Sequence, residues 1–365
     1  MKNIVIFIPS IESGGVEKNL FYIINHIQYK FKRVFLVSVD KFKDKKLSKN
    51  IKLLSPSSKY YSNKSRIIKS LICFFIIVKN FWNKEILIFS LQSNFFSIVA
   101  SKLINSKIIL RLNTSPEKYS ANFIKKFIFK ILYSLADKII VNSYEFKNNF
   151  KNYYNLDSTV ILNPLKIIKT KKKISFFKKF NRLKIIGIGR LTHQKDHMTL
   201  LKSLKLLKYK FKVNFRLYLI GKGYNFNLLS NFIKNSGLQK NIKLAGYKKN
   251  AFEYIKSSDL LVLTSRYEGL PNVLIEAQAS GMPIISSNCP SGPREILMNG
   301  KLGELFKVGD YKGLCKKIFK FSENKKILRK KSILAKKYLY RYDYNTNLKR
   351  YTKILKDNID WDFEK

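Results

Sequence analysis

Two glutamates, Glu268 and Glu276, stand with seven residues between them, at a point where a strand passes through a loop into a helix. The apolar run at residues 260–264 is typical of a buried parallel strand, and Glu268 lies in the polar loop that follows it. Helical side chains lean toward the helix N-terminus, so Glu276 can reach back toward Glu268. The backbone N–H groups between the two acids form a natural anion site. Two carboxylates beside free amides predict a polyhydroxylated, phosphorylated ligand.

A second polar segment, residues 187–196, follows another apolar run and contains Arg190 and Lys195. Arginine offers a planar fork of donors for phosphate oxygens, and lysine offers a mobile point charge. Both would project from one loop at the carboxyl end of a strand, which favours a phosphate site. The alternative interpretation is two surface cations in a very basic chain.

Glycine, proline and asparagine mark where the elements around these segments begin and end. Pro271 suits a first helical turn, Asn272 can cap the helix there, and Gly281 is placed to end it. Near the N-terminus, Gly14 and Gly15 lie between a strand and a helix, as in doubly wound folds that bind phosphate. That glycine pair is weak evidence alone, because the full dinucleotide fingerprint is missing.

The chain alternates short apolar runs with amphipathic segments in two successive series. The first series of expected strands is 3–8, 33–39, 85–90, 107–113, 138–142 and 159–162. The second series is 185–189, 215–220, 242–245, 260–264 and 283–287. The pattern predicts an α/β protein with two doubly wound, Rossmann-like domains facing a cleft. The expected parts are an N-terminal domain at 1–168, a basic linker at 169–183, a C-terminal domain at 184–340 and a final helical segment at 341–365.

The formal charge of +49 over 365 residues is extreme. It is compatible with nucleic acid, an anionic membrane or acidic substrates as partners, and equally with a lysine-rich composition that has no functional meaning. Two basic and aromatic segments, residues 59–80 and 121–135, read either as packed helices with a wet lysine face or as membrane-surface contacts. The longest apolar run, residues 71–78, is too short to span a bilayer, and no signal peptide is evident.

The three cysteines, Cys73, Cys289 and Cys315, are far apart and show neither a disulfide framework nor metal spacing. An Asp-x-Asp spacing occurs at residues 360–362, but it follows no strand, so we attribute it to chance. We therefore expect no metal and no cofactor.

These motifs, in this order, resemble the retaining nucleotide-sugar glycosyltransferases of glycosyltransferase family 4, which have the GT-B architecture. The resemblance covers nearly the whole chain and is strongest at residues 185–306. It implies that residues 1–168 form the acceptor-side domain, that residues 184–340 bind the nucleotide sugar and that the helix in 341–365 packs back on the first domain. The glutamate pair matches the family's paired-glutamate motif, and residues 189–191 with Lys195 match its diphosphate motif. Residues 13–15 match the N-terminal glycine loop, and residues 292–297 match a later family segment.

The resemblance implies a role for each matched residue. Arg190 and Lys195 would neutralise the donor diphosphate, while Glu268 would contact the transferred sugar and Glu276 the ribose hydroxyls. The remaining donor-binding residues implied by position are Gly14 and Gly15 at the diphosphate, Gly269, Leu270 and Asn272 through their amides, Tyr247 near the base and Asn113 near the sugar. Many family members carry a histidine where this chain has Asn113, so that correspondence rests on position alone.

The implied function is transfer of a hexose or N-acetylhexosamine from a nucleotide diphosphate sugar, with UDP preferred, to a lipid-linked or cell-envelope glycan. Fixed cations on the departing phosphate lower the barrier to such a transfer without a metal. The expected location is the cytoplasm, at the cytoplasmic face of the inner membrane, with an anionic membrane surface as a partner and no nucleic acid. Two alternatives remain: a non-catalytic basic protein that binds membrane or nucleic acid on the same scaffold, and a nucleotide-sugar epimerase or hydrolase.

Overall fold

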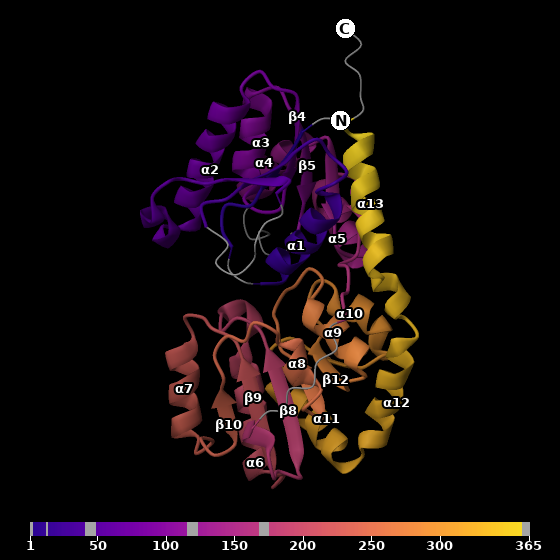
Figure 1. The fold of residues 1–365 in the computed structure, drawn as a ribbon. Helices are drawn as coiled ribbons and strands as arrows, with labels where there is room; N and C mark the ends of the chain where they lie inside the picture. The colour runs from indigo at the N-terminus through magenta and orange to yellow at the C-terminus, as the bar shows by residue number, and fades with distance from the viewer. Residues whose placement is uncertain (1–2, 12–13, 41–48, 115–122, 168–174, 360–365) are drawn as a thin grey trace. The chain divides into compact units, whose positions relative to one another are not determined.

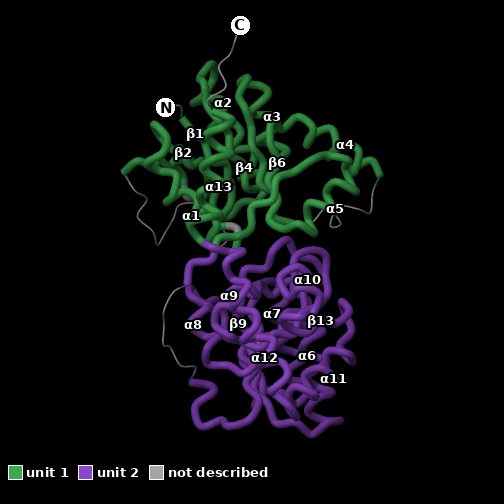
Figure 2. Tube along the Cα trace, turned by 90° about the vertical axis from the view of Figure 1, so that its right-hand side faces the viewer, with its two compact units in different colours: residues 1–164, 344–365 green, residues 165–343 purple. Residues whose placement is uncertain are grey.

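The computed structural model describes residues 3–11, 14–40, 49–114, 123–167 and 175–359. The chain forms two compact units (Figure 2). Unit 1 comprises residues 1–164 and 344–365, and unit 2 comprises residues 165–343. Each unit is built on one parallel sheet, and Figure 1 labels its elements.

The sheet of unit 1 has seven strands in the order β3-β2-β1-β4-β5-β6-β7. They span Asn3–Phe7 (β1), Val34–Val37 (β2), Ile51–Leu54 (β3), Ile86–Ser90 (β4), Lys107–Arg111 (β5), Lys138–Val141 (β6) and Thr159–Val160 (β7). Strand β1 is paired in parallel with both β2 and β4, with Ile4 opposite Val34 and Leu87. The central strands are buried throughout, which explains why they read as continuous apolar runs.

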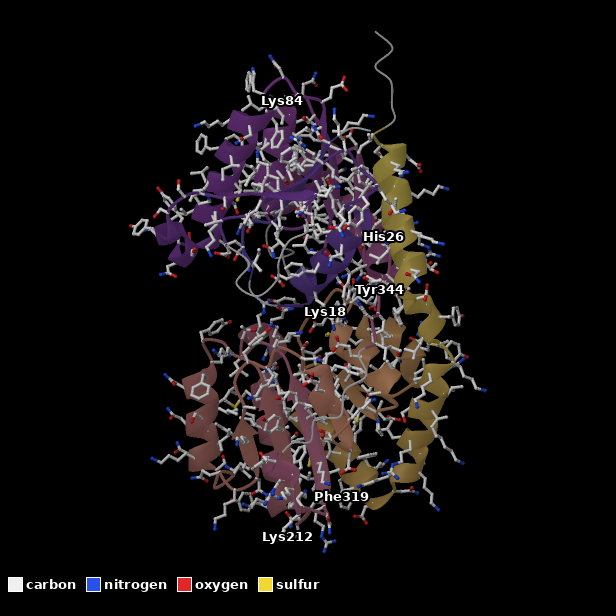
Figure 3. The ribbon with its side chains drawn as sticks, in the orientation of Figure 1. Lys18, His26, Lys84, Lys212, Phe319 and Tyr344 are labelled. Carbon is white, nitrogen blue, oxygen red and sulfur yellow. The ribbon has the colours of Figure 1, made fainter. Side chains whose placement is uncertain are left out.

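Helices cover both faces of this sheet. One face carries α1 (Gly15–Ile27) and α13 (Tyr344–Asp357), whose Leu348, Tyr351 and Leu355 complete a single core cluster with β1 and β4. Tyr344, labelled in Figure 3, meets Tyr22 of α1 edge-on, with ring centroids 5.2 Å apart. The other face carries α2 (Arg66–Phe81), α3 (Asn94–Leu103), α4 (Phe123–Ser134) and α5 (Tyr144–Tyr154). A 3-10 turn, η1 (Lys59–Asn63), precedes α2.

The sheet of unit 2 has six parallel strands in the order β10-β9-β8-β11-β12-β13. They span Leu183–Ile188 (β8), Phe215–Ile220 (β9), Ile242–Leu244 (β10), Leu260–Leu263 (β11), Ile284–Ser287 (β12) and Glu304–Phe306 (β13). The helices are α6 (His197–Tyr209), α7 (Phe226–Asn235), α8 (Phe252–Ile255), α9 (Asn272–Ser280), α10 (Pro293–Ile296), α11 (Tyr311–Glu323) and α12 (Lys325–Lys336). Short 3-10 turns are η3 (Ser175–Phe177), η4 (His193–Lys195), η5 (Met298–Gly300) and η6 (Leu339–Tyr342).

Strand order reverses direction at the centre of each sheet. In unit 1, β1 lies between β2 and β4, and in unit 2, β8 lies between β9 and β11. The segments that follow β8 and β11 therefore lead to helices on opposite faces of the sheet. In open parallel sheets, ligands bind at such a reversal point. The predicted α/β fold with two doubly wound sheets is confirmed.

The boundaries of the two units differ from the sequence expectation. Residues 165–167 and 175–183 cluster with unit 2, whereas the sequence predicts that unit 1 runs to residue 168 and a linker covers 169–183. Residues 168–174 lie outside the described residues. The many lysines of this segment predict an exposed linker, but its aromatic residues pack into unit 2. Phe177 is buried, and the Phe176 carbonyl oxygen accepts a hydrogen bond of 2.6 Å from Arg216. The second crossing lies between Asp343 and Tyr344 rather than at residue 341.

Some local elements also differ from expectation. Strand β3 and helix α5 are absent from the sequence-based assignment, because β3 is short and half-exposed and α5 is rich in polar asparagine and lysine. At α9 the cap position is Pro271, with extended backbone, and Asn272 is the first helical residue, so the predicted Asn272 cap is wrong. Gly281 ends α9 in the left-handed conformation at φ +70°, as predicted.

A buried arginine ties α13 to the sheet of unit 1. Arg111, at the end of β5, is 1% exposed and its Nε donates to the Tyr351 hydroxyl at 2.7 Å. Its two terminal nitrogens donate to the amide oxygens of Asn113 and Asn163, the latter at 2.7 Å. These three partners are neutral side chains, so the cation is held by hydrogen bonds and by the nearby Tyr351 ring.

We predict that Arg111→Met lowers the free energy of unfolding of unit 1 by about 3 kcal/mol, because it removes three donors from buried oxygen acceptors. Urea unfolding followed by circular dichroism measures the change. Arg350→Met is the matched control, since Arg350 is exposed on α13. Equal unfolding midpoints for the two variants would contradict the assigned role.

Candidate functional site

The loops that follow β8 and β11 are locked together by hydrogen bonds. The Gln194 side-chain amide donates to the Tyr267 carbonyl oxygen at 3.0 Å, and the Arg266 N–H donates to the Gln194 carbonyl oxygen at 2.8 Å. The Thr264 hydroxyl donates to the Lys195 carbonyl oxygen at 2.9 Å. Two segments about 70 residues apart in sequence therefore form one rigid polar edge.

Lys195 and Glu268 meet at this edge. The Lys195 ammonium forms an ion pair with Glu268 Oε1, and both side chains are largely buried. The same oxygen accepts a hydrogen bond of 2.5 Å from the hydroxyl of Ser265, which is fully buried. The Glu268 N–H donates to the Pro290 carbonyl oxygen at 2.7 Å, which fixes the loop that carries the carboxylate. A charged pair with extra hydrogen bonds is the arrangement that makes burial of both charges tolerable.

Arg190 lies just after the end of β8, and its side chain is exposed. Its guanidinium donates to the side-chain oxygen of Gln194 at 3.4 Å, and Gln194 directly precedes Lys195 in the same loop. Asp196 caps α6 through Thr199 and pairs with Arg266 at 3.2 Å, which anchors the far end of this loop. The structure thus brings Arg190, Lys195 and Glu268 together.

The segment from Gly269 to Glu276 continues from that loop into α9. Leu270 is 5% exposed, so only its backbone is available to a ligand, and Glu276 is buried in the second turn of the helix. Gly292, at φ +93°, lets a neighbouring loop pass directly against Gly269, because a Cβ there would overlap the Gly269 carbonyl oxygen.

Tyr247 is placed at the same edge of the sheet. It follows Gly246, whose φ is +65° and whose carbonyl oxygen accepts a hydrogen bond from the Gly221 N–H at 3.0 Å. A Cβ on Gly221 would in turn overlap the carbonyl oxygen of Gly189. The ends of β8, β9 and β10 therefore approach one another, and Tyr247 stands beside them with 44% of its surface exposed.

The predicted site residues of unit 1 already have partners within that unit. The Gly14 N–H donates to Glu17 Oε2 at 2.7 Å, so a carboxylate of the chain occupies the start of α1. The Asn113 side chain accepts from Arg111 and donates to the Leu91 carbonyl oxygen at 2.7 Å. These contacts give Gly14 and Asn113 structural duties, and the ligand roles implied for them and for Gly15 stay predictions. Ser13 of the glycine motif lies outside the described residues.

Sequence reasoning missed several residues of the edge in unit 2. Ser265 and Gln194 adjoin the motif residues and hold Glu268 and Arg190, and Gly221 allows the close approach of the loops. Only the polar character of Ser265 and Gln194 beside the motifs could have indicated them.

Two buried titratable groups adjoin the edge without taking part in its ion pair. Burial, reinforced by the charge of Glu268, raises the pKa of the Cys289 thiol to about 12, so this thiol stays protonated. Burial, together with the charge of Lys195, lowers the pKa of His197 to about 4, so this imidazole is neutral near pH 7.

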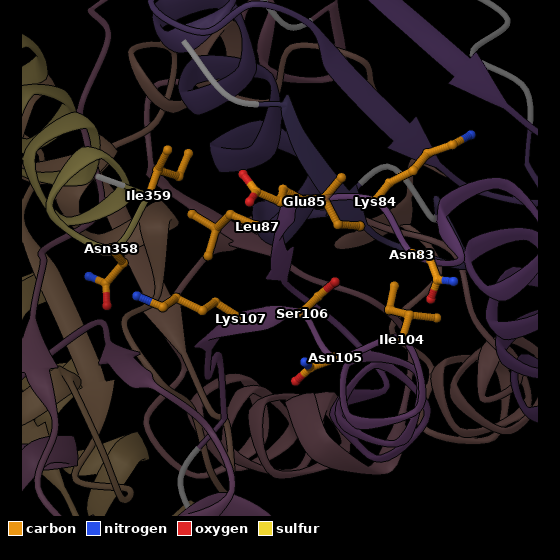
Figure 4. Close-up of a pocket in the computed structure, with 11 residues that line it drawn as sticks. Asn83, Lys84, Glu85, Leu87, Ile104, Asn105, Ser106, Lys107, Asn358 and Ile359 are labelled. Atoms are coloured by element: carbon orange, nitrogen blue, oxygen red, sulfur yellow. The ribbon is translucent and has the colours of Figure 1, made fainter. Parts of the chain in front are cut away.

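A cavity of about 220 Å³ lies elsewhere, in unit 1 (Figure 4). It is lined at the amino ends of β4 and β5, by residues that include Glu85, Ser106 and Lys107. That is the edge opposite to the one where parallel sheets bind ligands. Its volume is also below the ~300 Å³ at which small-molecule sites begin. We therefore place the candidate site at the carboxyl ends of β8 and β11.

Among the described residues, no group of three or more histidine, cysteine, aspartate or glutamate side chains could hold a metal ion. Within the same part of the chain, no helix is long and apolar enough to cross a membrane.

Comparison with known proteins places this site in a family domain. Residues 168–338 match the model of the glycosyl transferases group 1. An uncharacterized glycosyltransferase of Methanocaldococcus jannaschii is 32% identical over 289 residues, which cover 72% of this chain and 70% of the relative. The N-acetylgalactosamine-N,N'-diacetylbacillosaminyl-diphospho-undecaprenol 4-alpha-N-acetylgalactosaminyltransferase of Campylobacter jejuni is 26% identical over 330 residues, 84% of this chain and 87% of that protein.

Solved structures share the fold. The crystal structure of Anabaena HepE in complex with UDP-glucose superposes with a TM-score of 0.78 at 19% identity, over 98% of this chain and all of that chain. Sucrose-phosphate synthase from Thermosynechococcus elongatus superposes with a TM-score of 0.79 at 12% identity, over 98% of this chain and 99% of that chain. At these identities the likeness establishes the two-domain GT-B fold alone.

We predict that the free energy of unfolding of unit 2 falls as the pH drops from about 6.5 toward about 4. The folded state holds His197 neutral, whereas the unfolded chain takes up a proton near pH 6.5, so acid favours unfolding. This group alone should cost about 2 kcal/mol at pH 5 relative to pH 7. Urea unfolding of the wild type and of His197→Gln at both pH values measures it. The variant should show a smaller difference between the two pH values, and an unchanged difference would refute the assignment.

Proposed function

Since the chain belongs to the glycosyltransferases and carries a group 1 domain, we propose that it moves a hexose or N-acetylhexosamine from a nucleotide diphosphate sugar to a glycan acceptor. The observation that carries this proposal is the Lys195–Glu268 pair beside Arg190, at the strand reversal between β8 and β11. It sets two cations and one carboxylate at the place where open parallel sheets bind ligands.

In the proposed reaction, two cations stabilise the departing diphosphate and one carboxylate stabilises the sugar. The bond between the anomeric carbon and the phosphate oxygen breaks, and its electron pair stays on the departing diphosphate. Arg190 and Lys195 stabilise that growing negative charge, because fixed cations at a partly dry site act strongly on it. Glu268 lies beside the sugar carbon, where positive charge develops. The acceptor hydroxyl oxygen forms the new bond on the face that the phosphate leaves, its proton passes to the phosphate, and the configuration is retained.

Lys195 changes partner in this scheme. Without donor it neutralises Glu268, and with donor it turns to the diphosphate oxygens. Ser265 keeps its hydrogen bond to Glu268, so the carboxylate stays in position while its negative charge becomes available to the sugar. Glu276, buried in the second turn of α9, faces the same loop and takes the ribose hydroxyls. This exchange of partners is why the two charges stand in contact before the substrate arrives.

We assign UDP as the nucleotide and a lipid-linked or cell-envelope glycan as the acceptor. The half-exposed ring of Tyr247 at the ends of the strands offers a stacking surface for the base. The HepE complex contains UDP-glucose, and the Campylobacter relative is named for a diphospho-undecaprenol-linked acceptor. We propose that an enzyme with such an acceptor acts in the cytoplasm, at the cytoplasmic face of the inner membrane.

We predict that Glu268→Gln and Lys195→Gln each reduce turnover by about 10²–10³-fold, the usual cost of removing one transition-state charge contact. Release of UDP from UDP-sugars in the presence of an extract of lipid-linked glycans measures it. Glu304→Gln is the control, since Glu304 also pairs with lysines, Lys317 at 2.8 Å and Lys331, but stands at the amino end of β13. Wild-type turnover in both site variants would overturn the site.

We also predict that transfer proceeds without a divalent cation, because Arg190 and Lys195 supply the positive charge on the phosphate. Activity is compared after dialysis against EDTA and after addition of Mg²⁺ or Mn²⁺. Rates that agree within about twofold are expected. Loss of activity in EDTA that Mn²⁺ restores would show that a metal takes this part.

A further inference from the structure

Helix α4 exposes most of its apolar side chains to solvent. Phe123, Phe127 and Ile131 recur every four residues and are 82%, 57% and 48% exposed, and Tyr133 is the buried residue of the helix. Helices of soluble proteins normally bury their apolar stripe against a core. In α4 the stripe instead points away from the sheet.

Two neighbouring helices repeat the arrangement. In α2, Ile67, Leu71 and Phe75 are 71%, 45% and 59% exposed, while Cys73 and Ile77 on the opposite side enter the core.

In α3, which packs against α2 (Figure 1), Phe95, Val99 and Leu103 are likewise exposed. All three helices cover the same face of the sheet, so their outer stripes point to the same side of unit 1. We call this surface the α2–α4 face.

Cations border the α2–α4 face. Arg66, Lys79, Lys102 and Lys130 are exposed on its helices, and the sequences of α2, α3 and α4 contain no aspartate or glutamate. Lys84, labelled in Figure 3, adds a charge just beyond the end of α2. The three helices of this face are therefore amphipathic, and they carry basic but no acidic side chains.

The opposite face of unit 1 shows that this pattern is local. There α13 exposes only polar side chains within its described span, including Lys349, Lys353 and Lys356, and neither α1 nor α13 has a large exposed hydrophobic residue. The general basicity of the chain affects both faces, whereas exposed aromatic and aliphatic side chains distinguish the α2–α4 face.

We propose that the α2–α4 face docks on an anionic lipid bilayer, with its apolar stripes in the interface and its lysines at the lipid headgroups. An exposed apolar area on three helices that carry lysine and arginine but no aspartate or glutamate fits that partner. A second copy of this chain would bring like charges together, and nucleic acid would leave the apolar stripes in water. The choice of a bilayer also rests on the proposed function, because a lipid-linked acceptor lies there.

The test is co-sedimentation of the full chain with vesicles of phosphatidylcholine alone and with 30% phosphatidylglycerol by composition, about the anionic fraction at which a basic surface binds. Binding is expected to the anionic vesicles only. The triple variant Phe123→Gln, Phe127→Gln, Ile131→Gln should reduce the partition coefficient at least about tenfold, since exposed side chains contribute little to folding but much to interfacial burial. Its circular dichroism and Tm should match the wild type.

The contribution of positive charge to vesicle binding is tested with two double variants, each of which removes two lysine charges. Lys102→Gln with Lys130→Gln should weaken binding about tenfold, whereas Lys349→Gln with Lys353→Gln on α13 should change it less than about twofold. Equal effects of the two pairs, or wild-type binding by the triple variant, would overturn the proposal. A dimer in sedimentation velocity that the triple variant dissociates would assign the face to a second copy and also overturn it.

The result of the vesicle-binding test does not depend on catalysis at Glu268. Vesicle binding is measured without donor, and UDP release from the donor is measured without vesicles. A Glu268→Gln protein that binds vesicles normally but releases no UDP would support both proposals. Normal UDP release with no vesicle binding would remove only the docking surface.

Discussion

The hydrogen bonds between β8 and β11 force two loops, distant in sequence, to leave the sheet side by side. Parallel pairing aligns the carboxyl ends of the two strands. The reversal of strand order leads the segments that follow them to helices on opposite faces of the sheet. Everything that gives unit 2 its polar edge follows from this geometry. Lys195 can meet Glu268 only because each stands a few residues beyond the end of one of these strands.

The polar edge of unit 2 also requires the backbones of neighbouring loops to approach one another closely. Gly221 and Gly292 stand where any side chain would strike a carbonyl oxygen of a neighbouring loop. Without a Cβ at these positions, the loop after β9 lies against Gly189 at the end of β8, and the loop after β12 lies against Gly269 in the loop after β11. Glycine at these two positions is therefore a steric requirement of the edge.

The sequence alone predicts the framework of the fold and which residues lie in the loops that form the polar edge. Strand and helix periodicity is local information, so the apolar runs of β8 and β11 and the loop positions of Arg190, Lys195 and Glu268 could all be read from it. Pairing is not local. Nothing in the sequence shows that Lys195 contacts Glu268, 73 residues away, or that Glu17 occupies the Gly14 amide. The described part of the predicted linker, residues 175–183, belongs to unit 2 for a related reason, since lysines dominate its composition while Phe177 is buried.

The return of α13 to unit 1 has a consequence for biosynthesis. Leu348, Tyr351 and Leu355 belong to the core cluster formed by β1 and α1, and Arg111 is hydrogen-bonded to the Tyr351 hydroxyl. These residues are translated after all of unit 2. The sheet of unit 1 therefore cannot gain this part of its cover until unit 2 has been made. Completion of the first hydrophobic core thus depends on residues that are translated after the second.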